Sequence, residues 1–273
     1  MRVVNSPLAL QKMLKEEHGS IGFVPTMGAL HLGHRTLIAA AKKANDIVVV
    51  SIFVNPTQFL EGEDLDAYPR KEEADKKVCE LSGADYLFYP DATSMYGSDE
   101  VSLNAPNVRG YIMEGTSRPG HFSGVLTVVN KLLNIVNPTR AYFGKKDAQQ
   151  LMLIETMVAN LFMNVEIVAM DTVREKDGLA MSSRNAYLSE EERTESLKII
   201  KSLRIATQLV MKGELGATKI RDEMLGILEP LEVEYVTIVS RSFEPIDNVE
   251  IGNTIILVEA LSGKTRLLDN IWI

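Results

Sequence analysis

The sequence has few of the residues that build covalent or metal-centred folds, and each scarcity excludes a class of protein. Cysteine occurs once in 273 residues, as Cys79, which excludes an intrachain disulfide and a zinc site made of cysteines. No apolar run approaches the ~20 residues that a membrane-spanning helix needs, so we expect no membrane association. The first residues show no pattern typical of a secretory signal peptide, and we expect a cytoplasmic location.

Positive charge is the other scarcity. The chain has 29 lysines and arginines against 37 aspartates and glutamates, a formal net charge of −8. Nucleic-acid binding needs clustered basic residues that replace counterions, so we expect no nucleic-acid partner. A local basic pocket for a small anionic ligand is still compatible with an acidic chain. The remaining composition, 45% hydrophobic and 24% charged, is typical of a globular protein.

Strand and helix patterns alternate over the first two thirds of the chain. Apolar runs predict strands, and apolar residues at helical spacing predict helices. The expected strands are 21–26, 47–54, 86–89 and 165–170, and the expected helices include 33–45 and 70–82. A first helix begins at Ser6 and Pro7, which suit a cap and a first turn, and it is expected to end at Gly19. This order predicts an α/β fold with a Rossmann-like doubly wound parallel sheet.

The last third has a different order of elements. Ser189 followed by Glu192 is a capping box, which predicts a helix running toward Met211. A second helix is expected at 218–228, and strands at 232–239, 254–260 and 266–271. We therefore predict two domains: a Rossmann-like domain over 1–176 and a smaller C-terminal α+β domain over 177–273.

The most informative motif is PTMGALHLGH at 25–34. It places His31 and His34, with Gly28 and Gly33, between an expected strand and an expected helix. A helix N-terminus offers N–H groups and a positive dipole end to a phosphate, and imidazoles can donate hydrogen bonds to charge developing on phosphorus. The motif resembles the His-x-Gly-His motif of the nucleotidyltransferase superfamily, whose members attack the α-phosphate of ATP. The alternative is that the histidines only cap the helix.

A second motif, VNPTQF at 54–59, ends an almost continuous apolar strand. Pro56 cannot continue a central ladder, so the strand must stop there. Ligands of open α/β sheets bind beyond the carboxyl ends of the strands. Asn55 and Gln58 are therefore expected on the same rim as His31 and His34.

Two later segments carry groups suited to polyphosphate. In YFGKKDAQQL, at 142–151, lysines and Asp147 follow a short strand and a glycine turn. Lysine suits a triphosphate, and Asp147 is suited to hold magnesium or to orient a lysine. In REKDGLAMSSRN, at 174–185, two serines precede Arg184, whose planar fork suits phosphate.

Together with DLDAYPR at 64–70 and GHFSGV at 120–125, these segments closely resemble the pantothenate synthetase (pantoate–β-alanine ligase) family. They occur in the family's order and cover most of residues 21–190. One departure stands at 144–147, where many members have Gly-Glu-Lys-Asp and this chain has Gly-Lys-Lys-Asp. No definite role follows for Lys145. The role of His121 is also open, since it either serves the site or only orders the 110–120 segment.

The resemblance implies an ATP-dependent ligase that condenses pantoate with β-alanine to pantothenate, for coenzyme A biosynthesis. The reaction runs through a pantoyl adenylate and releases AMP and pyrophosphate, with Mg accompanying ATP. The implied partners are ATP, pantoate and β-alanine. The resemblance implies that the 1–176 domain binds ATP and pantoate and that the 177–273 domain closes over the ATP site. A homodimer is also expected, since family members commonly form one and the chain ends in the apolar run Ile271, Trp272, Ile273.

The resemblance also implies the site residues. His34, His31 and Lys146 are the expected catalytic residues. The expected ATP-binding residues are Met27, Gly28, Ala29, Leu30, His31, Leu32, Gly33, His34, Gly144, Lys145, Lys146, Asp147, Val173, Met181, Ser182, Ser183 and Arg184. Gln58, Gln150 and Asn55 are expected to bind pantoate or β-alanine, and Asp75 or Asp147 is the expected magnesium contact.

Three other functions compete. Another His-x-Gly-His enzyme, such as pantetheine-phosphate or nicotinamide-mononucleotide adenylyltransferase, would not need the glutamines of NPTQF and KKDAQQ. A nucleotide-binding regulator without catalysis should lack His34 or Lys146, and both are present. A tRNA-charging fragment is disfavoured by the net charge.

Overall fold

The computed structural model describes all 273 residues, and the chain divides into two compact units. Unit 1 comprises Met1–Lys145 and Leu153–Asp171, and unit 2 comprises Lys146–Met152 and Thr172–Ile273. Helix α7 (Ala148–Asn160) passes from unit 2 into unit 1 along its length. The domain division at 176 stays a prediction. No helix combines the length and the apolar character needed to cross a membrane.

Unit 1 is built on a six-stranded sheet in which every pairing is parallel, with the order β1-β4-β3-β2-β5-β6. The strands are β1 (Arg2–Val4), β2 (Ile21–Thr26), β3 (Ile47–Ile52), β4 (Tyr86–Phe88), β5 (Arg140–Gly144) and β6 (Glu166–Met170). Strand β1 was not predicted, because three residues are too few to show a period. Strands β2 and β5 are neighbours at the point where the order reverses, which is where open α/β sheets bind ligands. The predicted α/β fold is confirmed.

Helices cover both faces of this sheet. The helices that lie wholly in unit 1 are α1 (Pro7–Glu16), α2 (Leu32–Ala44), α3 (Glu72–Leu81), α4 (Ala92–Met95), α5 (Glu114–Ser117) and α6 (His121–Val136). Side chains of α2 and α3, including Ile38 and Cys79, pack with Val48 and Val50 of β3 in one buried cluster. Helix α1 contacts α6, and α6 contacts β2. Every residue of β3 is buried, so the sheet is covered on both faces there. Ser6 caps α1 as predicted, but α1 ends at Glu16, before Gly19.

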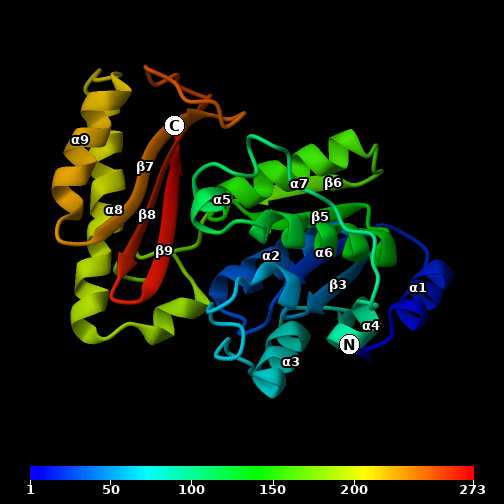
Figure 1. Cartoon of the computed structure of the whole chain (residues 1–273). Coiled ribbons are helices and arrows are strands. Elements are labelled where there is room, and N and C mark those ends of the chain that lie inside the picture. Colours follow the sequence, from blue (N-terminus) through cyan, green and yellow to red (C-terminus); the bar gives the residue numbers. More distant parts are fainter. The chain divides into compact units, whose positions relative to one another are not determined.

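Unit 2 contains a three-stranded antiparallel sheet and two long helices (Figure 1). The elements are α8 (Glu190–Met211), α9 (Ala217–Leu228), β7 (Glu232–Ser240), β8 (Thr254–Ser262) and β9 (Thr265–Trp272), with β8 in the centre. Ser189 and Glu192 form the predicted capping box of α8. Apolar residues of α8 and α9, such as Leu203 and Met224, pack against Val258 of β8. The predicted smaller α+β part is confirmed.

Candidate active site

The turn after β2 is shaped by two left-handed residues and a buried aspartate. Gly28 has φ +90° and Ala29 has φ +50°, a conformation that a non-glycine residue seldom adopts. This backbone aims two amides at Asp75 of α3: the Ala29 N–H lies 2.8 Å from Oδ2 and the Leu30 N–H lies 2.7 Å from Oδ1. Burial raises the pKa of Asp75, and the two amide bonds oppose that rise. Asp75 therefore holds the turn with both carboxylate oxygens.

His31 and His34 close the start of α2 as a capping box. Nδ1 of His31 accepts from the Gly33 N–H at 3.2 Å, and Nδ1 of His34 accepts from the His31 N–H at 3.2 Å. A backbone amide can only donate, so each Nδ1 is unprotonated and the hydrogen of each neutral ring sits on Nε2. The rings lie 4.1 Å apart between centroids. Capping and phosphate recognition are thus compatible, because capping fixes the tautomer in which Nε2 donates.

The second motif forms a short 3₁₀ turn, η1 (Pro56–Gln58), that presents Gln58. The amide nitrogen of Asn55 donates to Oε1 of Gln58 at 3.2 Å and to the carbonyl of Gly124 at 3.3 Å. The oxygen of Asn55 accepts from the hydroxyl of Tyr96 at 2.7 Å. Nε2 of Gln58 lies 2.9 Å from the sulfur of Met27, so this glutamine meets the histidine turn. Asn55 is 1% exposed, and its side chain serves the turn itself.

In unit 2, the turn at Lys146 and Asp147, which precedes α7, is held by strand β9. The carbonyl of Lys146 accepts a 2.7 Å hydrogen bond from the side-chain amide of Asn270 in β9. The ammonium of Lys146 lies 3.2 Å from a carboxylate oxygen of Asp147. In unit 1, by contrast, Lys145 pairs with the exposed carboxylate of Asp171 at 2.6 Å. The lysine that departs from the family's pattern is therefore paired within unit 1.

The serine-bearing loop of unit 2 is braced by two arginines. Arg174 makes bonds of 2.5 and 3.0 Å to the two oxygens of Asp269 in β9 and also donates to the carbonyl of Gly178. Arg193 of α8 contacts Glu175 and Asp177 at 2.7 and 2.6 Å. These contacts flank the segment that carries Ser182, whose hydroxyl accepts from the Arg184 N–H and caps η2 (Ser183–Tyr187).

The predicted site residues divide between the units, which are described separately. Unit 1 holds Met27, Gly28, Ala29, Leu30, His31, Leu32, Gly33, His34, Asn55, Gln58, Asp75, Gly144 and Lys145. Unit 2 holds Lys146, Asp147, Gln150, Val173, Met181, Ser182, Ser183 and Arg184. The sequence reasoning missed Asp269 and Asn270, which are 3% exposed. The available signal was only two adjacent polar residues between Leu268 and Ile271 of an expected strand, a pattern that names no partner.

The chain has no protein-only metal cage. No group of three or more histidine, cysteine or carboxylate side chains is placed to hold a metal ion. Asp75 already accepts two backbone amides, whereas Asp147 is 45% exposed beside Lys146. Mg²⁺ is commonly held by one or two carboxylates together with substrate phosphates, and Asp147 suits that arrangement better than Asp75.

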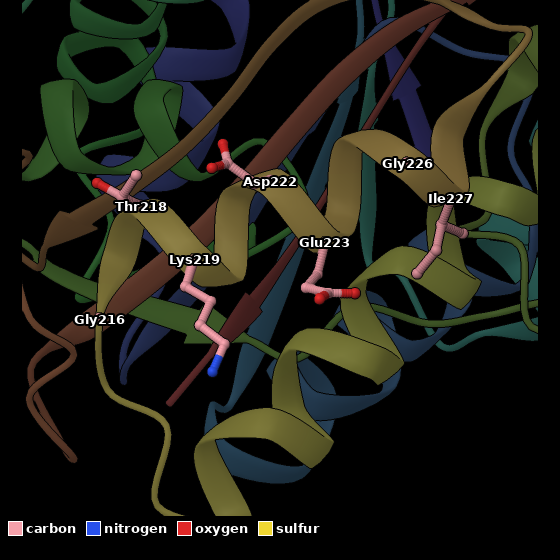
Figure 2. Close-up of a pocket in the computed structure, with 7 residues that line it drawn as sticks. All are labelled: Gly216, Thr218, Lys219, Asp222, Glu223, Gly226 and Ile227. Atoms are coloured by element: carbon pink, nitrogen blue, oxygen red, sulfur yellow. The ribbon is translucent and has the colours of Figure 1, made fainter.

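One open groove in unit 2 contains none of the predicted site residues. It runs along α9 and is lined by Gly216, Thr218, Lys219, Asp222, Glu223, Gly226 and Ile227 (Figure 2). Lys219 in this groove is paired with Glu214. The groove has no cluster of converging polar groups, and it is not a candidate for the chemistry of the motifs.

Comparisons with known proteins agree with these features. A family model described as pantoate-beta-alanine ligase matches residues 2–272. The pantothenate synthetase of Sulfurimonas denitrificans is 63% identical over 273 residues, covering 100% of both chains. The crystal structure of pantothenate synthetase from Thermus thermophilus is 38% identical, with a TM-score of 0.95 over 99% of each chain. A Francisella tularensis pantoate-beta-alanine ligase, complexed with beta-gamma ATP and beta-alanine, is 34% identical with a TM-score of 0.83, over 100% of this chain and 97% of that one.

Proposed function

The chain belongs to the pantoate-beta-alanine ligase family, and we propose how its residues carry out that reaction. The enzyme condenses pantoate with β-alanine at the expense of ATP, in pantothenate biosynthesis. A carboxylate is a poor acyl donor, so the carboxylate of pantoate first attacks the α-phosphorus of ATP and releases pyrophosphate. The amine of β-alanine then attacks the pantoyl adenylate and releases AMP.

The first step brings two anions together, so donors must neutralise charge that develops on the phosphates. The Nε2–H groups of His34 and His31 supply such donors, because both Nδ1 atoms are committed to the capping box. His34 donates to the α-phosphate or its bridging oxygen, where charge grows as pyrophosphate leaves. Two amides of the turn, those of Ala29 and Leu30, are already bonded to Asp75, so in this proposal the imidazoles carry the phosphate contact.

Unit 2 supplies the cationic and hydroxyl groups of the proposal. Lys146 holds the polyphosphate, and its turn is fixed by Asn270. Ser182, Ser183 and Arg184 bind the leaving pyrophosphate. Met27, Gly28, Gly144 and Val173 contact ATP mainly through their backbone.

The acid substrate is assigned to glutamines. Gln58 and Gln150 bind pantoate, because an amide can bond its hydroxyls and carboxylate without neutralising the attacking oxygen as an arginine would. Asn55 acts by orienting Gln58, since its own amide is bonded to Gln58 and Gly124. Asp147 is the carboxylate suited to contact a magnesium ion that accompanies ATP. Bound there, the ion would offset phosphate charge.

We further propose a homodimer that works in the cytoplasm, where ATP is supplied. The apolar C-terminus offers limited support for the dimer, because Trp272 is covered by the guanidinium of Arg241, 5.5 Å from its ring centre. Sedimentation at micromolar concentration tests this assembly, and a monomer mass would contradict it.

One observation carries the catalytic proposal: both motif histidines present the tautomer that donates from Nε2, in a chain of this family. The test is release of AMP that requires pantoate and β-alanine together. Pantoate labelled with ¹⁸O in its carboxylate should pass one label to AMP. Unlabelled AMP from active enzyme would exclude the adenylate, and a dinucleotide product would indicate an adenylyltransferase instead.

A further inference from the structure

Beside the Gln58 turn lies a buried group of charged residues that the mechanism does not use. Arg118 makes a two-pronged pair with Glu63, with bonds of 2.7 and 2.8 Å, and a 2.9 Å bond to Glu114. Arg118 and Glu114 are each 7% exposed, and His121 is 5% exposed. The group joins the segment after η1 to α5 and to the first residue of α6.

His121 links this group to the backbone of Gln58. Its Nε2 lies 2.9 Å from Nη1 of Arg118, and its Nδ1 lies 2.7 Å from the carbonyl oxygen of Gln58. A guanidinium only donates and a carbonyl only accepts, so Nε2 accepts and Nδ1 carries the hydrogen. Burial lowers the pKa of His121; the charge of Arg118 lowers it too, whereas that of Glu114 opposes the shift. His121 therefore has the opposite tautomer to His31 and His34.

The fit between α6 and the Gln58 turn is tight. A Cβ at Gly124 would lie 2.2 Å from the carbonyl oxygen of Thr57 and 2.9 Å from the Cα of Gln58. The carbonyl of Gln58 also lies 3.4 Å from Nη2 of Arg118. The backbone of Gln58 is thus fixed from α6, while its side chain is oriented by Asn55.

Stability alone is a poor explanation for such a group. A buried ion pair is often no more stabilising than apolar residues of similar volume, because the charges must be desolvated. What the group supplies is a fixed orientation of the Arg118 side chain, because the two-pronged pair with Glu63 sets the plane of the guanidinium. That plane in turn sets the imidazole that donates to Gln58.

We propose that His121 is a positioning residue for the acid substrate, held by Arg118 and Glu63, and that it acts by fixing the backbone of Gln58. The inference rests on the proposed role of Gln58 in binding pantoate. It assigns a role to His121 and Arg118, which otherwise only order the 110–120 segment.

Two substitutions of His121 separate positioning from packing. His121→Asn retains an N–H near the position of Nδ1, and His121→Gln retains a polar group near that of Nε2 but loses the donor to Gln58. We expect His121→Gln to raise the KM for pantoate about tenfold, as the loss of one hydrogen bond allows, with the KM for ATP changed less than about twofold. His121→Asn should keep the KM for pantoate within about threefold of wild type.

Gln58→Ala, measured in parallel, separates the role of Gln58 in binding pantoate from the positioning role of His121. If Gln58→Ala raises the KM for pantoate but His121→Gln matches His121→Asn, the positioning role is overturned and the proposed function stands. If Gln58→Ala leaves that KM unchanged, the role of Gln58 fails and the inference fails with it.

If His121→Gln does not fold, Glu63→Gln decides. This variant keeps the shape of a partly exposed side chain while removing the charge that anchors Arg118. A selective rise in the KM for pantoate of about two- to fivefold supports the inference, and an unchanged KM overturns it.

Discussion

The two units support their site residues by different means. In unit 1, motifs hold one another: His31 and His34 bond within one motif, and His121 of GHFSGV bonds to Gln58 of NPTQF. In unit 2, two of the supports come from β9, which carries no recognisable motif. Asn270 reaches the Lys146 carbonyl from 124 residues away, and Asp269 reaches Arg174 from 95 residues away. A motif can therefore contain its own scaffold, or it can depend on residues that look ordinary in the sequence.

The largest effect is expected at the self-supported histidines. His34→Asn keeps an acceptor near the Nδ1 position for the His31 N–H but has no donor at the place of Nε2. Single-turnover formation of the adenylate, at saturating ATP and pantoate, should fall by about 10²–10³, because a preorganised donor is lost. Thermal stability should stay close to that of wild type. A rate within about threefold of wild type, under 1 kcal/mol, would show that His34 only caps the helix.

Loss of the support that Asp269 of β9 gives to Arg174 should lower both the stability of the protein and its affinity for ATP. Asp269→Asn removes the charge that faces Arg174, and we expect the free energy of unfolding to fall by about 2–3 kcal/mol, because Arg174 loses a charged, buried acceptor. The KM for ATP should rise while the KM for pantoate does not. Urea unfolding and steady-state kinetics measure both effects.

A matched control is the exposed pair of Lys76 and Glu73, which lie 3.1 Å apart, with the side chain of Glu73 89% exposed. Glu73→Gln should change the free energy of unfolding by less than about 1 kcal/mol. Equal losses in Glu73→Gln and Asp269→Asn would show that the Arg174–Asp269 pair stabilises the fold no more than an exposed surface pair does.

The turn that carries His31 and His34 depends on Asp75, which lies outside the motif. Unit 1 therefore also has one support that its motifs do not contain. Asp75→Asn replaces one acceptor oxygen by a donor facing the amide of Ala29 or Leu30. The free energy of unfolding should fall by about 1–3 kcal/mol, measured without ATP or magnesium, because a buried amide loses its partner. If stability is unchanged and only the magnesium dependence of activity shifts, Asp75 is a metal contact and not a brace.

The smallest effect is a pH dependence located at His121. Its pKa in the folded protein is lowered by burial, so folding disfavours the charged ring. Relative to an unfolded value of about 6.5, stability is fully present above that pH and falls as the pH drops from it toward the folded pKa. The slope is at most about 1.4 kcal/mol per pH unit.

Comparing wild type with His121→Asn between about pH 6.5 and 5.5 isolates this contribution, because the other histidines are common to both proteins. Glu63 does not obscure it. Burial raises the pKa of Glu63, but hydrogen bonds and charge from Arg118 outweigh burial and leave that pKa below its usual range. The contribution of ionised Glu63 to stability is therefore lost only at lower pH. Parallel pH profiles of the two proteins would show that His121 is not held neutral.

Sequence patterns predicted the architecture well because strand and helix periods are local. The helix over 33–45 was predicted nearly residue for residue, since α2 spans Leu32–Ala44. The short elements α4 and α5 were missed, because one helical turn shows no period.

The candidate site was predictable where chemistry and support share a motif. The two histidines were predicted to donate hydrogen bonds to phosphate, which stays a prediction, and their capping role was foreseen as the alternative. The brace from Asp75 was not foreseen, because its partners are backbone amides that leave no trace in the sequence. Nor was the support from β9, because its pairing with Lys146 exists only after the chain has folded.

The reactivity of the single thiol, Cys79, can report the local opening of α3, the helix that carries Asp75. Cys79 lies one turn after Asp75 in α3, is fully buried, and has its pKa raised to about 12 by burial, with the charge of Asp75 adding to the rise. Only a thiolate reacts at an appreciable rate, so the folded protein should resist thiol reagents until α3 swings away from the sheet. The rate at which a thiol reagent labels Cys79 therefore measures how often α3 opens and Asp75 releases the turn that carries the two histidines. No engineered probe is needed.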